Sequence, residues 1–245
     1  MKYAVASFSK TGPRPKNEDA IGIWRSETRV GVAVADGLGG MGGGERASQL
    51  AIHEFKDFVS FHPAPTVSDL KALALQIHKK IKDEQRAGSF REMATTLSAG
   101  IFYGDRLIAV HCGDSRISLA RGAGIKRLTR DHSEAQRLLE AGKLTKVEYA
   151  DYPRKNILES ALGINGTPSI DTLNYDIKEG DRFFFTSDGV HNIVLLRELQ
   201  MLAREFVEPT DMVQQVERMI DKRGAEDNFS MIAVYAESQF ADLMS

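Results

Sequence analysis

The sequence predicts an α+β fold in which antiparallel β-sheets are covered by helices. The prediction rests on the order of patterns along the chain: strands, two amphipathic helices, further strands, two more helices and a final strand. Elements of one kind come in blocks rather than in strict alternation. A polar segment at 133–162, which is poor in strand signals, interrupts the strands and is expected to be an insertion.

The first part of the chain contains three expected strands and two expected helices. Apolar runs and alternation predict the strands at 3–8, 20–24 and 30–35. The segment GERASQLAIHEFKDFVSFHP is typical of a helix, because four apolar residues fall on one face: Ala47, Ala51, Phe55 and Phe58. A second helix is expected over 68–88, with Ser68 or Asp69 as its N-cap and Gly88 as its end.

Most of the remaining strands are expected in the middle of the chain. Short turns such as YGD and RGAG join four candidates into an antiparallel meander, at 95–103, 106–111, 115–120 and 124–128. After the insertion the pattern predicts strands at 171–176 and 182–187, helices at about 193–206 and 210–222, and a last strand, FSMIAVYA, at 229–236.

The composition is that of an ordinary globular protein of 245 residues, with 42% hydrophobic and 27% charged residues. A formal net charge of −2 provides no global attraction to nucleic acid or to an anionic membrane. Cys112 is the only cysteine, which excludes an intrachain disulfide and favours the cytoplasm. No apolar run has the length of a secretory signal or of a membrane span, so we expect a cytoplasmic protein.

Several acidic residues lie next to stretches that should be buried. They are Asp36 in VGVAVAD, Asp114 in AVHCGDS, Asp188 in RFFFTSD and Asp227 in GAEDNFSMIAVY, with Glu18 and Asp19 in RPKNEDA just before a strand. One such aspartate is usually a turn residue. A group of them would repel one another unless a cation held them, and the pattern therefore predicts a divalent metal site.

The ligand types narrow the choice of metal. Oxygen donors alone favour Mg²⁺, Mn²⁺ or Ca²⁺, whereas zinc would require His or Cys, and the six histidines form no metal-spaced pair. The spacing is not that of an EF-hand loop. Two Mg²⁺ or Mn²⁺ ions bridged by a carboxylate recur in phosphoester hydrolysis. Arg14, four residues before Glu18, could hold two phosphate oxygens in its guanidinium fork, although a surface role is the alternative.

Eight motifs occur in an order that resembles the metal-dependent serine/threonine protein phosphatases of type 2C, the PPM family. They are RPKNEDA, VAVADGLGGMGGGERAS, ATTLSAG, HCGDSRISL, LTRDHS, ALG, GDRFFFTSDGV and EDNFSMIAV. The chain is most similar to the compact bacterial members, and the resemblance covers essentially its whole length. It implies one catalytic domain over 1–245, a four-layer α-β-β-α sandwich with metals in a cleft at one edge, and a flap at about 133–162.

The resemblance also implies a set of metal ligands. Asp36 would bridge two core metal ions, which would be Mn²⁺ or Mg²⁺. Asp188 and Asp227 would complete the protein ligands of the first ion. Glu18 and the backbone carbonyl of Gly37 would bind the second ion, largely through waters. Gly37 would let the main chain turn so that its own oxygen becomes a ligand, and the glycines after it would let the loop pass beneath the cleft.

Further roles follow from the same resemblance. A third, weaker metal would bind at Asp114 and Asp188, with an ordinary hairpin-turn aspartate as the alternative for Asp114. Asp19 would orient waters on the metals without touching the ions. Asn228 would support the turn that carries Asp227.

The implied reaction is direct hydrolysis of phosphoserine or phosphothreonine in a protein substrate. A hydroxide shared by the metals would attack phosphorus while Arg14 and the metals balance the charge, so no protein nucleophile is needed. Cys112 is then expected in the core, and Ser115 and Ser187 are expected to form local hydrogen bonds. The implied partners are a phosphoprotein and an opposing serine/threonine kinase, with no nucleic acid or membrane, and the chain is expected to be a monomer.

The chain departs from the family pattern at one chemically important position. Leu38 stands where members from higher organisms commonly have a histidine that acts as general acid, which leaves the proton donor unassigned. His191 is close in sequence to Asp188 but is expected to point elsewhere. In the flap, RKN and KLTK could contact an acidic phosphoprotein or form a solvated surface.

Two other functions remain open at this level. The chain could be a binding scaffold that keeps the fold without turnover, although intact candidate ligands count against it. It could also be a two-metal phosphoesterase that acts on nucleotides.

Overall fold

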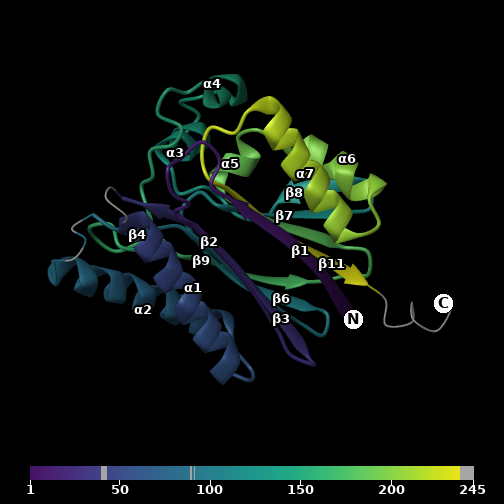
Figure 1. Ribbon diagram of the computed structural model, residues 1–245, viewed down its shortest axis with the longest axis horizontal. Helices are drawn as coiled ribbons and strands as arrows, with labels where there is room; N and C mark the ends of the chain where they lie inside the picture. Colours follow the sequence, from purple (N-terminus) through teal and green to yellow (C-terminus); the bar gives the residue numbers. More distant parts are fainter. Residues whose placement is uncertain (40–42, 89, 91, 238–245) are drawn as a thin grey trace.

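Two antiparallel β-sheets form the centre of the computed structural model, which describes residues 1–39, 43–88, 90 and 92–237 (Figure 1). One sheet has the order β1 (Lys2–Lys10), β11 (Phe229–Glu237), β10 (Arg182–Thr186), β7 (Arg116–Arg121) and β8 (Gly124–Arg127). The other has the order β2 (Asp19–Arg25), β3 (Arg29–Leu38), β5 (Leu97–Tyr103), β6 (Arg106–Cys112) and β9 (Asp171–Asp176). A short strand, β4 (Ala94–Thr95), pairs with the end of β3.

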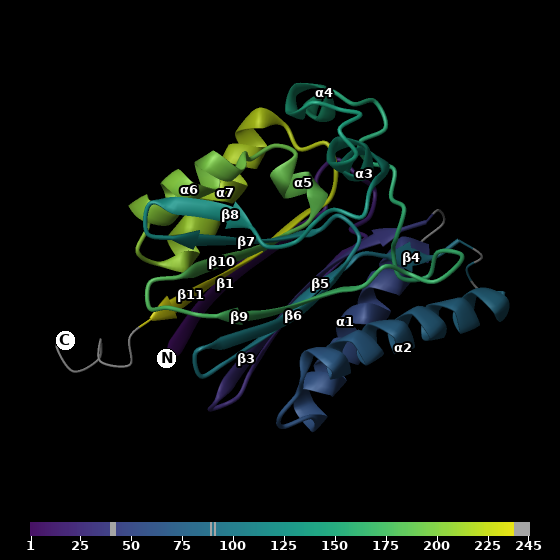
Figure 2. The ribbon, with the colours of Figure 1, turned by 180° about the vertical axis from the view of Figure 1, so that it is seen from behind.

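Helices cover the outer faces of both sheets, so the sandwich has four layers (Figure 2). Helices α1 (Gly43–Phe61) and α2 (Val67–Arg86) pack on the sheet that contains β3. Helices α5 (Asp188–His191), α6 (Leu196–Glu205) and α7 (Pro209–Arg223) lie on the sheet that contains β11. The segment 133–162 carries two short helices, α3 (Glu134–Glu140) and α4 (Lys146–Ala150), at one end of the sandwich. This arrangement confirms the predicted fold class.

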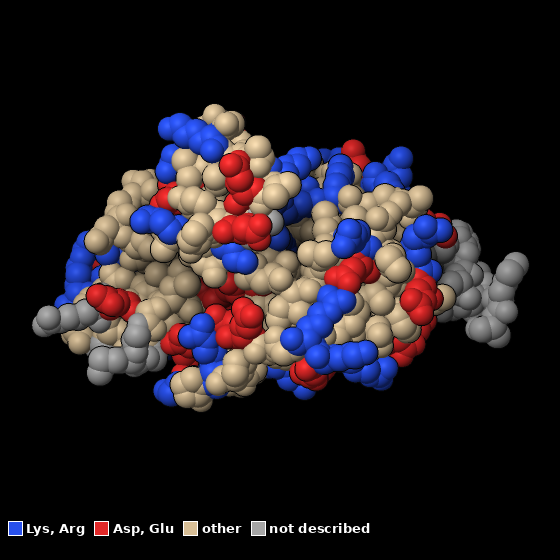
Figure 3. Space-filling model, turned by 90° about the horizontal axis from the view of Figure 1, so that it is seen from above, with Lys and Arg blue, Asp and Glu red and all other residues tan. Residues whose placement is uncertain are grey.

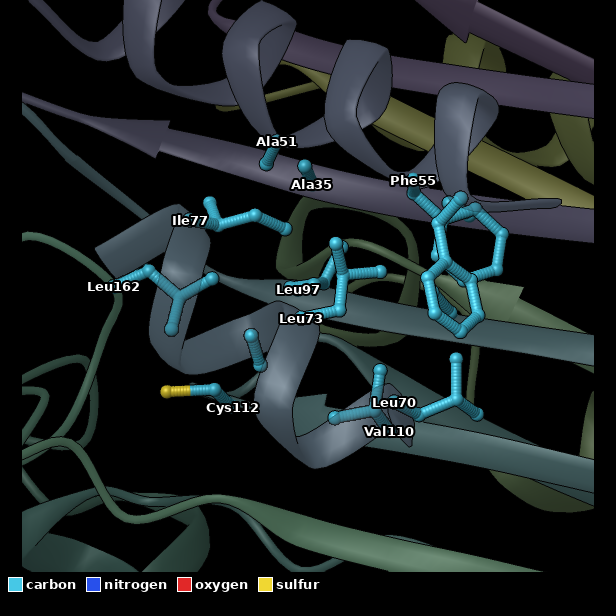
Figure 4. Close-up of a cluster of buried hydrophobic side chains, with 14 of the residues drawn as sticks. Ala35, Ala51, Phe55, Leu70, Leu73, Ile77, Leu97, Val110, Cys112 and Leu162 are labelled. Carbon is cyan, nitrogen blue, oxygen red and sulfur yellow. The ribbon is translucent and has the colours of Figure 1, made fainter. Parts of the chain in front are cut away.

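Buried apolar side chains hold the layers together. Figure 4 shows Phe55 of α1 and Leu73 and Ile77 of α2 among side chains of the underlying sheet. Between the sheets, Val32 and Phe183 belong to a separate cluster, and both are fully buried. Each large apolar side chain buried in this way stabilises the fold by about 1.5–3 kcal/mol. Cys112 is also buried in the core, as predicted.

The meander predicted over 95–128 is wrong in one respect that matters for function. Strands β5 and β6 pair in one sheet and β7 and β8 pair in the other, so the turn between β6 and β7 crosses from sheet to sheet. Gly113 makes this turn with φ of 108°, a conformation that favours glycine. Asp114 therefore lies on a crossover between sheets and not in a hairpin turn.

Some element bounds also differ from the prediction. The stretch 95–103 is divided into β4 and β5, and residues 188–191 form a short helix that the sequence pattern did not indicate. The middle of the predicted glycine-rich loop, 40–42, lies outside the described residues. None of the helices in the described part of the chain has the length and apolar character needed to cross a membrane.

The N-cap of α2 is Thr66 and not Ser68 or Asp69. The Thr66 side chain accepts a hydrogen bond from the Asp69 backbone N–H, and the Asp69 carboxylate accepts one from the Thr66 N–H at 2.9 Å. Together these bonds satisfy two N–H groups that the helix leaves free. We expect Thr66→Ala to lower the Tm by roughly 2–4 °C without changing activity. Differential scanning fluorimetry measures the Tm of both proteins. A Tm for Thr66→Ala that differs from that of the parent protein by less than about 1 °C would contradict the prediction.

Candidate active site

A cavity of about 320 Å³ opens at the end of the sandwich where several loops meet. Its walls contain Arg14, Glu18, Asp36, Gly37, Leu38, Gly39, Asp114, Asn156, Leu158, Asp188, Asp227 and Asn228. Figure 3 looks onto this end of the molecule and shows acidic side chains in a hollow, with basic side chains nearby. Of the residues predicted for the site, all except Asp19 therefore line one cavity.

The sequence suggested that Asp36 follows the end of a strand, but in the structure it lies inside β3. The strand continues to Leu38 because β4 pairs with its last residues. Hydrogen bonds hold the Asp36 main chain on both sides: its N–H donates to Thr96 Oγ1 at 2.9 Å, and its C=O accepts from the Thr96 N–H at 2.9 Å. Thr95 Oγ1 also donates to the Asp36 C=O at 3.0 Å. The ATT motif thus fixes the backbone from which the Asp36 carboxylate projects.

Gly37 is required for space and not for a turn. It does not lie in the left-handed region, whereas Gly39 has φ of 135°. A Cβ on Gly37 would lie 2.3 Å from the Gly44 carbonyl oxygen and 2.6 Å from the Glu18 carbonyl oxygen. The Gly37 N–H donates to that Glu18 oxygen at 3.1 Å. The absence of a side chain therefore lets β3, the start of α1 and the Glu18 loop meet closely.

Asn228 holds the loop that carries Arg14 and Glu18. Its side-chain Oδ1 accepts a hydrogen bond from the Glu18 N–H at 2.8 Å. Its Nδ2 donates to the Thr11 carbonyl at 2.7 Å and to the Lys16 carbonyl at 2.9 Å. The sequence led us to expect support for the Asp227 turn, and the Asn228 backbone N–H does donate to Asp227 Oδ1 at 2.8 Å. The Asn228 side chain also connects the start of β11 to residues 11–18.

Arg14 and Asp227 contact each other directly. Arg14 NH2 donates to Asp227 Oδ2 at 2.7 Å, and both side chains are partly exposed, at 55% and 39%. The resemblance had assigned Arg14 to the substrate phosphate and Asp227 to a metal ion. The ion pair places both groups at the same side of the cavity, where a phosphate could replace the carboxylate as the partner of the guanidinium.

Burial and neighbouring negative charges raise the pKa values of Asp36, Asp114 and Asp188. For Asp36, burial is the largest cause and the negative charges of neighbouring aspartates add to it, so its pKa lies well above the usual value. Burial, followed by the charges of Asp188 and Asp131, raises the pKa of Asp114 to about 8. Burial also leads the causes that raise the pKa of Asp188. Partly buried negative charges that disfavour one another in this way form a site that a cation stabilises.

Asp19 lies behind the cavity wall. It is 8% exposed and is paired with Asp36 across β2 and β3. Its Oδ2 accepts a hydrogen bond from Ser187 Oγ at 2.7 Å, while burial raises its pKa to about 7. Ser187 therefore forms a local hydrogen bond, as expected, and so does Ser115, whose Oγ lies 2.7 Å from Thr96 Oγ1.

The donor set fits a hard divalent cation. Within the described residues, no three His, Cys, Asp or Glu side chains already stand in an arrangement that could hold a metal ion. The acidic residues that line the cavity nevertheless offer carboxylate oxygens, and no His or Cys is among the described residues of its wall, a set that suits Mg²⁺ and Mn²⁺ and not zinc.

Sequence reasoning missed two groups that shape the site. Asn156 and Leu158 of the 133–162 segment line the cavity beside the candidate ligands. Thr95 and Thr96 were noticed only as part of a motif, yet they hold the Asp36 backbone. The paired threonines were a usable signal, because buried hydroxyls need hydrogen-bond partners. In the flap, RKN, which includes Asn156, was expected to contact a phosphoprotein or to form a solvated surface, but nothing in the segment indicated that it lines the cavity.

Comparison with known proteins decides the family. A family model described as Protein phosphatase 2C matches residues 14–232. The chain belongs to the protein phosphatase 2C family. The resemblance inferred from the motifs is thereby confirmed, together with the enzyme class, a protein serine/threonine phosphatase.

Similar proteins and solved structures come from bacteria. Protein phosphatase PhpP of Streptococcus pneumoniae is 29% identical over 234 residues, which cover 94% of this chain and 95% of that protein. A serine/threonine phosphatase structure from S. agalactiae shares 27% identity and has a TM-score of 0.88, covering 96% of this chain and all of the other. The catalytic domain of the phosphatase PstP, in complex with two manganese ions, shares 26% identity with a TM-score of 0.84 and covers 96% and 99% of the two chains.

Proposed function

We propose that this 2C-family phosphatase hydrolyses phosphoserine and phosphothreonine in proteins, using two Mn²⁺ or Mg²⁺ ions held in the cavity. The observation that carries the proposal is the convergence of Glu18, Asp36, Asp188 and Asp227 on one cavity that also contains Arg14. The carboxylates come from four separate parts of the chain. Without a bound cation their mutual repulsion would disfavour this arrangement.

The residues that would hold the two ions are those assigned from the resemblance. Asp36 would bind both, Asp188 and Asp227 the first, and Glu18 and the Gly37 carbonyl the second. The PstP domain in complex with two manganese ions supports this number and this metal. Such ions, when bound, make water reactive at neutral pH and neutralise charge on the phosphoryl group.

The chain's own residues bind and orient the substrate. Arg14 exchanges its contact with Asp227 for two phosphate oxygens, which its planar fork fits. Leu38 has no proton to give. His191 borders a neighbouring cavity, and its pKa is lowered well below the usual value, first by burial and then by the charge of Arg116. We therefore assign the proton for the departing serine or threonine oxygen to water.

A comparison of hydrolysis rates for different substrates separates this function from the alternatives. We expect Mn²⁺-dependent hydrolysis of para-nitrophenyl phosphate and of phosphoserine and phosphothreonine peptides, abolished by EDTA and restored by Mn²⁺. Faster turnover of nucleotides or cyclic diesters than of any phosphopeptide would favour a nucleotide phosphoesterase. Binding of phosphopeptides with no turnover at any metal concentration would favour a scaffold.

Replacing Arg14 should mainly weaken substrate binding. We expect Arg14→Ala to raise the KM for a phosphopeptide by roughly 10- to 100-fold with a smaller change in kcat, because a charge-assisted contact to phosphate is lost. Arg14→Lys keeps the charge but not the fork and should recover only part of the loss. Steady-state kinetics at saturating Mn²⁺ measure both, and an unchanged KM in Arg14→Ala would remove Arg14 from the phosphate site.

The remaining expectations extend the proposal. We propose that residues 1–245 form one catalytic domain with 133–162 as its flap, and that the chain acts as a cytoplasmic monomer against a serine/threonine kinase. A third, weaker ion would bind at Asp114 and Asp188, which line the same cavity. The position of Asp114 on the crossover between the sheets supports this role.

A further inference from the structure

A second cavity, of about 210 Å³, lies beside the first and opens under the flap. Its walls contain Asp114, Arg116, Asp131, Tyr149, Lys155, Asn156, Asp188, His191, Asn192 and Leu195. Asp114, Asn156 and Asp188 border both cavities, so the two adjoin along that wall. A peptide whose phosphorylated residue occupies the first cavity would therefore place a neighbouring side chain at the second.

The deep wall of the second cavity is built around Asp131, which is 3% exposed. Arg116 donates two hydrogen bonds to it, at 3.0 Å and 2.6 Å, and Arg127 donates a third at 3.1 Å. The hydroxyl of Tyr149 in the flap donates a fourth at 3.1 Å. Arg116 lines the cavity and Arg127 does not, but both guanidinium groups bind the one Asp131 carboxylate, so this cluster carries a net positive charge.

Two cations of the cavity keep hydrogen-bond donors to spare. Arg116, whose side chain is 21% exposed, uses Nε and NH2 for Asp131, and its NH1 has no partner among the described residues. Lys155 is exposed at the flap side, and its ammonium group forms no hydrogen bond or ion pair within the described part of the chain. Asn156 next to it adds a neutral polar group.

The other carboxylates of the cavity do not cancel this charge for a substrate. Asp114 and Asp188 lie on the wall shared with the first cavity and belong to the candidate metal site. An anionic group would therefore bind away from that wall, between Arg116 and Lys155. The volume is below the range typical of small-molecule pockets and suits a single side chain.

We propose that this second cavity binds an anionic side chain of the phosphoprotein substrate, close in sequence to the residue that is dephosphorylated. The group is a carboxylate or a second phosphoryl group, held by Arg116 and Lys155. The phosphatase then prefers phosphorylation sites with acidic neighbours. The proposal rests on the proposed function, because it deepens the choice of substrate at the same active site.

A positional peptide series tests the preference. Each peptide carries one phosphothreonine and a single Asp, Asn, Lys or phosphoserine at one position within three residues on either side. We expect Asp to raise kcat/KM over Asn by roughly three- to tenfold at one or two positions, and phosphoserine to raise it at least as much. Lys at those positions should lower it. If Asp raises kcat/KM and phosphoserine does not, the cavity selects carboxylates. If both raise kcat/KM, the cavity selects anions in general.

A charge reversal locates the effect. In Lys155→Gln the preference for the Asp peptide over the Lys peptide should shrink, because only Arg116 still holds the anion, and in Lys155→Glu the preference should be lost. Lys143→Glu is the matched control, because Lys143 is exposed in the same flap, undergoes the same charge change and lines neither cavity. The control should keep the preference of the parent protein.

Two results would overturn the inference. One is a kcat/KM for Asp peptides within about twofold of that for Asn peptides at every position in the parent protein. The other is an equal change of preference in Lys155→Glu and Lys143→Glu, which would indicate a general field and not a pocket. Turnover of the Asn peptides reports separately on the proposed function. If no peptide is hydrolysed, that function fails, while fluorescence anisotropy of the labelled peptides still ranks their binding.

Discussion

Asp36→Asn should abolish hydrolysis and yet raise the Tm of the protein in metal-free buffer. The Asp36 carboxylate is partly buried at the cavity wall, and this burial together with the charges of neighbouring aspartates raises its pKa. Asparagine has a similar shape and no charge, so the repulsion falls when no cation is bound, and each kcal/mol relieved raises Tm by roughly 2–4 °C. The same change removes the proposed bridging ligand, and we expect activity to fall by a factor on the order of 10³ or more.

Activity with saturating Mn²⁺ and melting curves in EDTA measure the two effects of Asp36→Asn. Asp105→Asn provides the control, because Asp105 is an exposed residue in the turn between β5 and β6 and should change neither quantity. The account also predicts that Mn²⁺ raises the Tm of the parent protein far more than that of Asp36→Asn. A variant that kept normal activity, or that melted at lower temperature in EDTA, would contradict this explanation of the buried charge.

Gly37→Ala should lose both stability and activity. The new Cβ would overlap the Gly44 and Glu18 carbonyl oxygens, which belong to the backbone and cannot rotate away. To remove this overlap, β3 must separate from the Glu18 loop. We expect the separation to lower the free energy of unfolding by about 3 kcal/mol or more, which lowers the Tm by roughly 6–12 °C. The separation would also displace the Gly37 carbonyl and Glu18, the proposed ligands of the second ion.

The matched control for Gly37→Ala is Gly124→Ala. Gly124 also lies in a strand without a positive φ, but a Cβ there would meet only the Arg121 carbonyl oxygen at 3.8 Å, an ordinary contact. We expect a Tm near that of the parent and full activity for the control. Calorimetry and Mn²⁺ titration of activity compare the two variants. If Gly37→Ala and Gly124→Ala have the same Tm and the same activity, the close approach around Gly37 is not required for stability or for activity.

The order of elements could be predicted from the sequence because each is an amphipathic or apolar segment with a local start or stop signal. Helix α2 illustrates this: its apolar stripe is buried, and it ends where Gly88 adopts φ of 90°. The sheet to which a strand belongs depends instead on distant partners. Strand β6 pairs with β9, which lies far along the chain, and this pairing takes it away from β7. Local patterns carry no information on that choice.

The candidate site was predictable to the extent that acidic residues at strand ends are unusual. The sequence could not indicate that Arg14 would pair with Asp227, since 213 positions separate the two residues. It also could not assign the Asn228 amide to the Thr11 and Lys16 carbonyls. Such contacts depend on how the loops converge after the sheets have formed. For the same reason, the sequence could not indicate that the flap lines both cavities.

The most direct measurement for the whole account is anomalous diffraction at the manganese edge from a crystal of the protein grown with Mn²⁺. We expect two strong peaks in the cavity, one beside Asp36, Asp188 and Asp227 and the other beside Asp36 and the Gly37 carbonyl, with Arg14 released from Asp227. Peaks confined to surface carboxylates, with that ion pair intact at saturating Mn²⁺, would contradict it.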